Sequence, residues 1–214
     1  GDDGSDVGQA TKQARLDAGG LYVEGCEWHC GRNFRVKDER RGQLLIEAAA
    51  EQGDACAKAY CIYTGWGGRD NDEEEAFKRF LELSEKEGHD AAMNMTGYFY
   101  NNNIGVAMDK KRGVECYIMA AEKGCSEARF NLGVCYAQGK GVTMDKEKAV
   151  GCYTMAAEKG CSDAKFNLGV CYEHGRGVAM DKEKAVEWYK KAAEQGHSVA
   201  RNFSHLWTCR YEIL

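Results

Sequence analysis

The eleven cysteines and five histidines of this chain are the residues that could form disulfides, bind a metal or take part in catalysis. Cys116 and Cys135 lie 19 positions apart, and Cys152 and Cys171 repeat that spacing one sequence period later. Two disulfides with this pairing would each join one helical segment to the next. The alternative is that cysteine, a small apolar residue, suits tight helix crossings and recurs because the sequence is duplicated. Both interpretations stay open at the level of sequence.

Metal binding is the second chemistry that these residue types allow. Cys26, His29 and Cys30 lie close together in the sequence, and Cys56 and Cys61 follow in the next unit. A single Cys-x-x-x-Cys segment lacks the second knuckle that structural zinc sites usually have. A local disulfide, or an exposed insertion around a buried tryptophan, explains the segment at least as well. We therefore predict no metal and no cofactor, and keep Cys26, His29 and Cys30 as the candidate set.

One position of the sequence period holds His89, Cys125, Cys161 and His197 in successive units. Neighbouring helical repeats would separate these side chains by about 10 Å, too far for one zinc ion with bonds of about 2.0–2.3 Å. We predict a surface turn at this position rather than a metal site.

Catalytic motifs would be a third kind of chemistry. No nucleophile elbow, phosphate-binding loop or paired His-Glu motif occurs in the sequence. Gly139-Lys-Gly-Val142 is too short for a phosphate loop and recurs as a turn. The histidines have no recurring acid or thiol partner, and most carboxylates are placed to cap helices or to pair with lysines. We predict that the chain is not an enzyme.

These residues are carried by a repeat. The segment Gly124–Lys159 is followed directly by a near copy, Gly160–Gln195, in which 25 of 36 positions are identical. Each copy is typical of two helices: Ser126 is the expected cap of the first, Gly139 its end, and Asp145 the cap of the second. Such a unit cannot bury its own apolar face, so the period predicts a stacked array.

The same pattern extends in both directions from the two copies. Asp90 is the expected cap one unit earlier, and Asn103 replaces the helix-ending glycine there. In the first unit Gly19, Tyr22 and Gly25 fit the register, with seven extra residues before Asp38. We divide the chain into a tail (1–11), a solenoid (12–196) with repeats at about 12–52, 53–87, 88–123, 124–159 and 160–195, and a C-terminal capping helix and tail (197–214), in which Ser198 is the expected cap of the helix.

Composition agrees with this organisation. The chain has no proline, 43% hydrophobic residues and a net charge of −5 with interleaved signs. It carries no basic stripe of the kind that binds nucleic acid, and no apolar run of 18 residues that would insert into a membrane. The fold class is therefore all-α, a right-handed α-solenoid of antiparallel helix pairs. The compartment stays unresolved, because the chain begins at Gly1 without a signal-like segment.

The motifs Asn131-Leu-Gly-Val-Cys-Tyr136, Gly139-Lys-Gly-Val142, Asp145, Lys148-Ala-Val150 and Ala156-Ala157 with Gly160 resemble the Sel-one-like (Sel1) repeat, a relative of the tetratricopeptide repeat. The resemblance implies a non-enzymatic adaptor or scaffold that binds protein partners. Cysteine-rich bacterial members carry bridged cysteines at positions that correspond here to Ala157 and Lys165, so the resemblance does not imply their disulfides.

The resemblance also implies that first-helix side chains face a concave groove that holds an extended peptide. The matching positions are Phe130, Asn131, Val134, Gln138, Phe166, Asn167, Val170 and His174. Asparagine amides could bind a peptide backbone, or satisfy carbonyls within the stack; the phenylalanines could pack between helices instead. Two other functions stay open: a structural subunit that makes contacts through its edges, termini and residues 25–38, and a secreted, disulfide-bonded effector.

Overall fold

The computed structural model describes residues 17–30 and 38–201, with the backbone alone for residue 18 and residues 27–30. Its helices follow one another in antiparallel pairs, as the repeat predicts, and each packs on the next along the chain. The ten helices within the described residues are α2 (Ala18–Cys30), α3 (Glu39–Glu51), α4 (Ala55–Thr64), α5 (Glu73–Lys86), α6 (Asp90–Asn102), α7 (Lys110–Glu122), α8 (Ser126–Gln138), α9 (Lys146–Glu158), α10 (Ser162–His174) and α11 (Lys182–Glu194).

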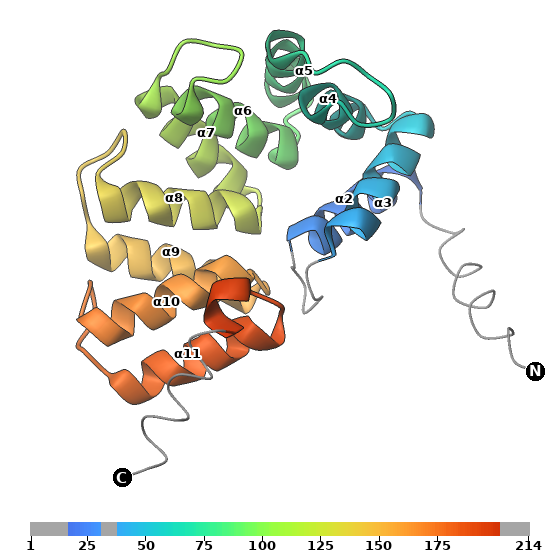
Figure 1. Cartoon of the computed structure of the whole chain (residues 1–214). Coiled ribbons are helices and arrows are strands. Elements are labelled where there is room, and N and C mark those ends of the chain that lie inside the picture. Colours follow the sequence, from blue (N-terminus) through green and yellow to red (C-terminus); the bar gives the residue numbers. More distant parts are fainter. Residues whose placement is uncertain (1–16, 31–37, 202–214) are drawn as a thin grey trace, which may run out of the picture.

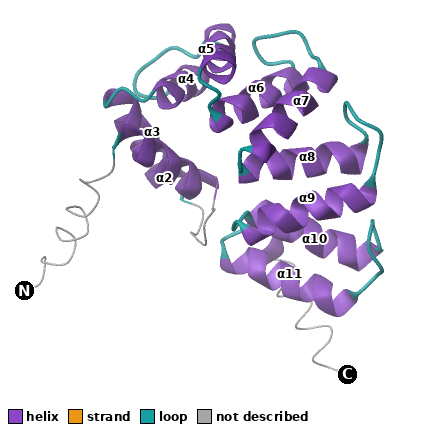
Figure 2. Cartoon of the chain, turned by 180° about the vertical axis from the view of Figure 1, so that it is seen from behind, coloured by secondary structure: helices purple, strands orange, loops and turns teal. Residues whose placement is uncertain are grey.

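The pairs stack into a curved array, an α-solenoid (Figure 1). Seen from both sides, α2 and α4 lie on the inner side of the curve and α3 and α5 on the outer side (Figure 2). Beyond α11, residues 198–201 are helical again, and Ala200 is fully buried like Ala164, its equivalent one period earlier. The chain therefore starts a further first-type helix after the last pair, as predicted, but Ser198 is its first helical residue and not its cap. None of the described helices is long and apolar enough to cross a membrane.

Aspartates start the second helix of every pair by accepting a backbone hydrogen bond from the third residue after them. The side chains of Asp109, Asp145 and Asp181 accept from the N–H groups of Arg112, Lys148 and Lys184 at 2.9–3.1 Å. Asp38 and Asp72 do the same for α3 and α5. The predicted cap at Asp145 is thus confirmed, and so is the left-handed end of α6 at Asn103, with φ of 57°.

First helices begin one residue earlier than the sequence indicated. The residue at the N-cap of α8 is Cys125 and that of α6 is His89, so Ser126 and Asp90 are the first helical residues. Neither N-cap side chain makes a capping hydrogen bond. The prediction that Ser126 and Asp90 are caps was therefore wrong. It followed the preference of serine and aspartate for N-cap positions, but here the residue before each of them is the N-cap.

Small residues at the helix crossings hold each pair together. A Cβ atom on Gly133 would lie 2.7 Å from Cε1 of Tyr153, and one on Gly169 would lie 2.4 Å from Cε1 of Tyr189. Helix axes approach closely because nothing larger than hydrogen stands at these positions. Gly25 holds the same place in α2, where a Cβ would lie 2.7 Å from Cγ1 of Ile46.

Because Gly25 is the crossing glycine of α2, the predicted alignment of the first unit with the later repeats was wrong. We had aligned Gly19 with the crossing glycine and Gly25 with the helix end, but α2 continues to Cys30. Gly25 precedes Asp38 by 13 residues and Gly133 precedes Asp145 by 12, so the expected seven-residue insertion is one residue long. Residues 26–30 belong to the helix, and residues 31–37 lie outside the described residues.

Loops between the two helices of a pair rest on the preceding repeat. A Cβ on Gly141 would lie 2.1 Å from the carbonyl oxygen of Lys110, and one on Gly177 would lie 2.2 Å from that of Lys146. Both glycines have positive φ, 72° and 75°. The loop after each first helix is therefore seated on the start of the preceding second helix. This contact fixes which side chains of neighbouring repeats meet.

Candidate functional site

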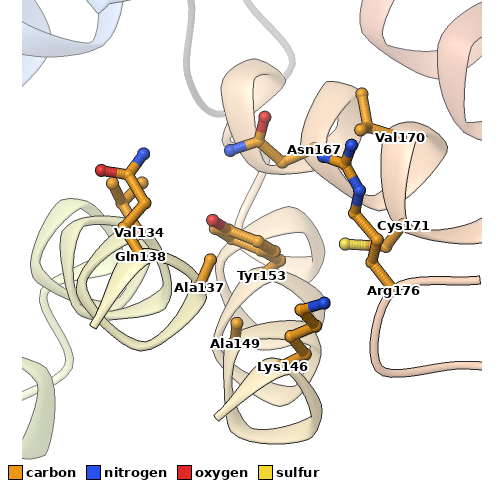
Figure 3. Close-up of a pocket in the computed structure, with 10 residues that line it drawn as sticks. All are labelled: Val134, Ala137, Gln138, Lys146, Ala149, Tyr153, Asn167, Val170, Cys171 and Arg176. Carbon is orange, nitrogen blue, oxygen red and sulfur yellow. The ribbon is translucent and has the colours of Figure 1, made fainter. Parts of the chain in front are cut away.

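A pocket of about 380 Å³ opens where α8, α9 and α10 meet, and we call it the α8–α10 pocket (Figure 3). Five of its ten lining side chains are apolar or small, while two amides, one phenol and two cations contribute polar atoms. Its lining residues are Val134, Ala137, Gln138, Lys146, Ala149, Tyr153, Asn167, Val170, Cys171 and Arg176. The pocket thus lies between the first helices of two consecutive repeats, with the second helix of the earlier repeat contributing Tyr153.

The two cations meet in this pocket because of the loop contact described above. Gly177 rests on the carbonyl of Lys146, and Arg176 directly precedes Gly177. The start of α9 and the beginning of the loop after α10 are therefore held together, although Lys146 and Arg176 are 30 residues apart in sequence. Both side chains are exposed and line the pocket (Figure 3).

Neither cation is neutralised by a carboxylate in the described part of the chain. Among the described residues, no carboxylate oxygen lies within 4.0 Å of the side-chain nitrogens of Lys146 or Arg176. Lys148 and Lys184 differ from them, because they pair with the capping carboxylates of Asp145 and Asp181 at 3.4 and 3.2 Å. The pocket therefore carries a positive charge that is open to a ligand.

The space itself arises from one departure from the repeat. Asn101, Ala137 and Glu173 occupy the same position in three successive first helices. Glu173 accepts a 2.7 Å hydrogen bond from the Tyr189 hydroxyl, and Asn101 hydrogen-bonds Tyr117, the equivalent tyrosine one repeat before Tyr153. The methyl group of Ala137 cannot do either, so it leaves room in front of the Tyr153 hydroxyl.

Tyr153 presents a buried phenol to this space. Its side chain is 4% exposed, and burial raises the pKa of its hydroxyl, with a smaller opposing contribution from a hydrogen bond with Asn167. The raised pKa keeps the hydroxyl protonated at neutral pH, so it can donate a hydrogen bond. Figure 3 shows the phenol between the amides of Gln138 and Asn167.

The structure brings four of the eight predicted groove residues into this pocket: Val134, Gln138, Asn167 and Val170. The other four have contacts elsewhere. The Phe130 ring packs 5.9 Å from that of Tyr153, and the His174 ring nitrogen lies 3.8 Å from a Glu173 oxygen. A role for any of the eight in partner binding stays a prediction.

Asn131 and Phe166 take the packing roles that we had considered as alternatives. Asn131 donates a 2.9 Å hydrogen bond to the side-chain oxygen of Asn94 in the preceding repeat. The Phe166 ring lies 5.4 Å from Tyr189 and stacks on the imidazole of His197 at 4.5 Å. His197 also accepts a hydrogen bond from the Ala200 N–H, so Phe166 helps to seat the terminal helix on α10.

The four cysteines proposed for disulfides are free thiols in this structure. Burial raises the pKa of the thiols of Cys116, Cys135, Cys152 and Cys171. A protonated, buried thiol is a poor nucleophile and a good packing residue. The pairing of Cys116 with Cys135 and of Cys152 with Cys171 stays a prediction.

The metal candidate lies on α2. Cys26 packs beside Tyr22 and Cys56, whereas the side chains of His29 and Cys30 lie outside the described residues. Among the side chains that are described, no three of His, Cys, Asp and Glu are grouped as metal ligands. The position shared by His89, Cys125, Cys161 and His197 is an N-cap. We had expected a surface turn there, but Cys125 and Cys161 are only 6% and 5% exposed, which corrects that prediction.

Sequence reasoning missed six residues of the pocket: Ala137, Lys146, Ala149, Tyr153 and Arg176 entirely, and Cys171 as a lining residue. One signal was present in the sequence. The position of Ala137 is polar in the repeats before and after it, and a single small residue between two polar ones indicates missing volume.

Together, the stacked helix pairs and the pocket between successive first helices define a helical-repeat protein. Five segments match the Sel1 repeat model, residues 28–54, 55–78, 90–125, 126–161 and 162–197. The chain belongs to the Sel1 repeat family, as the sequence motifs predicted. Our own division into repeats, which begins at residue 12, remains a proposal. A comparison with curated proteins finds no match.

Solved structures share the architecture. A Sel1 repeat protein from Oxalobacter formigenes is 29% identical, with a TM-score of 0.66 over 92% of this chain and 80% of that one. A Sel1 repeat protein from Klebsiella pneumoniae is 19% identical, with a TM-score of 0.53 over 88% and 91% of the two chains. An immunity protein from Pseudomonas aeruginosa is 21% identical, with a TM-score of 0.54 over 87% and 68%. The last two likenesses show the fold alone.

Proposed function

We propose that this chain is a non-enzymatic scaffold that holds a segment of a protein partner along its first helices. The observation that carries the proposal is the α8–α10 pocket, which opens between two such helices and includes four of the residues that sequence resemblance assigned to partner binding. Ligand sites in helical arrays form in this way, because the gap between neighbouring repeats admits side chains of an extended segment.

The chemistry of the pocket supports binding rather than catalysis. Its polar groups are amides, a protonated phenol and two cations, which recognise a ligand by hydrogen bonds and charge. Its thiol, Cys171, is buried and has a raised pKa, the opposite of what an activated cysteine nucleophile needs. An immunity protein from Pseudomonas aeruginosa shares this fold, and its name gives one biological role in which the fold is used.

A photo-crosslinking experiment tests where the partner binds. We would place benzoylphenylalanine at Gln138, an exposed pocket residue on α8, or at Met155, which is 48% exposed on the second helix α9. Adducts in native extract that form from position 138, and are absent from position 155, are the expected result. Adducts from position 155 alone would overturn the groove and favour the rival function, a structural subunit that makes contacts through its outer face.

A further inference from the structure

We infer that the α8–α10 pocket binds a carboxylate of the partner segment, with Lys146 and Arg176 supplying the positive charge and Tyr153 a hydrogen bond. This inference rests on the proposed function and names the chemical group that the pocket selects. The carboxylate is that of an aspartate or glutamate side chain or of a C-terminus, both of which carry the same group.

The next repeat shows the same arrangement occupied from within the chain. There the carboxylate of Glu173 accepts a 2.7 Å hydrogen bond from the Tyr189 hydroxyl. Tyr153 is the equivalent of Tyr189, and Ala137 is the equivalent of Glu173. The α8–α10 pocket therefore has the tyrosine without its carboxylate, and a carboxylate supplied by a ligand would restore the pair.

The hydrogen-bonding capacity of Tyr153 fits this role. A phenol has one proton to donate, and its oxygen can accept at the same time. The side-chain amide of Asn167 lies beside the hydroxyl and acts to lower its pKa. Among the described residues no acceptor takes the phenol proton, which leaves it for a ligand in the pocket.

Charge and shape select a carboxylate over a neutral or cationic group. Lys146 and Arg176 have no carboxylate partner among the described residues, and a guanidinium binds a carboxylate through two parallel hydrogen bonds. Val134, Ala149 and Val170 form an apolar wall that suits the methylene groups next to the carboxylate. A volume of about 380 Å³ holds one such residue together with its backbone.

The equivalent junction one repeat earlier supplies a matched control. Lys110 and Lys140 correspond to Lys146 and Arg176, so the charge is similar. Tyr98 and Asn101 stand there in place of Val134 and Ala137, and both are larger. If charge alone attracted acidic segments, both junctions would do so; if the pocket is required, only the later one will.

The test uses the full chain and pools of immobilised octapeptides with randomised flanks. The two carboxylate pools have either a central Glu with a C-terminal amide or a central Gln with a free C-terminus. The neutral pool has a central Gln with a C-terminal amide. The phosphoserine pool has a central phosphoserine with a C-terminal amide. We expect the wild-type chain to bind a carboxylate pool about tenfold more than the neutral pool, the size of one charge-assisted hydrogen bond. The two carboxylate pools distinguish a side chain from a C-terminus.

Variants then separate the pocket from general electrostatics. Lys146→Gln with Arg176→Gln is expected to bring the carboxylate-to-neutral ratio to about one, while Lys110→Gln with Lys140→Gln leaves it unchanged. Ala137→Glu is expected to abolish the preference by placing a carboxylate in the pocket, whereas Ala107→Glu adds the same charge at an exposed loop and preserves it. All four sites of the charge-removing pairs are exposed, so these variants should keep the helical circular dichroism of the parent.

Several outcomes would overturn the inference. The first is that the Lys146→Gln, Arg176→Gln variant still prefers the carboxylate pools to the neutral pool. The second is that the Lys110→Gln, Lys140→Gln control loses this preference to the same extent. The third is that the wild-type chain binds the phosphoserine pool more tightly than either carboxylate pool. If the wild-type chain binds all pools equally, the pocket does not select a carboxylate, but the proposed peptide binding is still supported. A chain that binds none of the pools overturns both this inference and the proposed function.

Discussion

The side-chain amide of Asn131 donates a 2.9 Å hydrogen bond to the side-chain oxygen of Asn94, and so joins α8 to α6 of the preceding repeat. In a solenoid the interfaces between neighbouring repeats supply much of the stability, because each repeat contacts only its neighbours. A side chain at a predicted groove position can therefore be structural, and Asn131 is one.

Asn131→Ala is accordingly expected to lower the free energy of unfolding by about 1 kcal/mol, the usual net value of one hydrogen bond. Asn94→Ala should cost a similar amount, and the double variant less than the sum of the two, because the same bond is removed only once. Urea denaturation followed by circular dichroism measures all three. Gln138→Ala, at an exposed position of the same helix, is the control and should change little. Additive effects of the two asparagine variants would show that the bond contributes nothing.

The crossing glycines give a second prediction. Gly169→Ala places a methyl group about 2.4 Å from the Tyr189 ring, which must shift; we expect a loss of about 1–3 kcal/mol, as for other overpacked cores. Gly151→Ala is the matched control, since it lies within α9 with no atom within 4 Å of its added Cβ. There alanine should stabilise the helix by up to about 1 kcal/mol. Thermal unfolding distinguishes the two glycines by the sign of the change in Tm, and equal signs would contradict the packing argument.

The crossing glycines also show what sequence could and could not predict. Gly133 and Gly169 align without ambiguity, because the two copies of the repeat are almost identical around them. In the first unit, Gly19 and Gly25 each stand three residues before an aromatic residue, Tyr22 and Trp28. The pattern fits both, and only the packing of Gly25 against Ile46 distinguishes them. Local patterns thus predict helix pairs well, but a divergent repeat needs its neighbours to set the register.

The pocket was harder to predict for a different reason. Its residues come from three helices and one loop of two repeats, and Lys146 and Arg176 meet through a loop contact rather than through a shared helix face. Groove positions on a single helix, such as Val134 and Gln138, are what the resemblance to the Sel1 repeat implies. The space between them depends on what the position of Ala137 lacks. That small side chain is visible only when successive repeats are compared, and no motif within one repeat records it.

Acid should weaken the caps of the second helices. The hydrogen bond from the Lys148 N–H holds the pKa of Asp145 below its usual value, and that from the Lys184 N–H does the same for Asp181. A depressed pKa in the folded state means that stability is complete above the unfolded value, about 3.9, and is lost as pH falls through the lower folded value. We expect the Tm to fall in that window.

The double variant Asp145→Asn with Asp181→Asn keeps both caps, because asparagine accepts the same backbone hydrogen bond, but it cannot be protonated there. Its Tm between pH 5 and pH 2 should fall less than that of the wild type. Glu147→Gln removes a carboxylate from the same helix without touching a cap and should follow the wild type. If the asparagine variant loses Tm as steeply as the parent, the acid sensitivity lies elsewhere.

Buried thiols should react slowly in the native chain. Burial raises the pKa of Cys61, Cys116, Cys135 and Cys171, so little thiolate is present at pH 8 and access to reagents is limited. Iodoacetamide at pH 8 is expected to modify these residues at least about tenfold more slowly than in urea, as measured by peptide mass spectrometry. Masses before and after reduction also test the two predicted disulfides, since each bridge adds two hydrogens to the reduced chain. Equal rates in both conditions would contradict the packing role.

Ala137→Glu connects the pocket to stability. In the next repeat, Glu173 accepts a hydrogen bond from the Tyr189 hydroxyl, and glutamate at position 137 would offer the same acceptor to Tyr153, with Lys146 and Arg176 nearby. A charge-assisted hydrogen bond adds about 1.5–3 kcal/mol when its partners are already in place, so the variant should equal or exceed the wild type in free energy of unfolding. Tyr153→Phe removes the donor, so it should lower the free energy of unfolding more in the Ala137→Glu background than in the wild type. Urea denaturation of the wild type, the two single variants and the double variant measures this coupling. If Ala137→Glu is destabilising and shows no coupling to Tyr153, the phenol proton does not face the pocket, and the carboxylate inference loses its geometric basis.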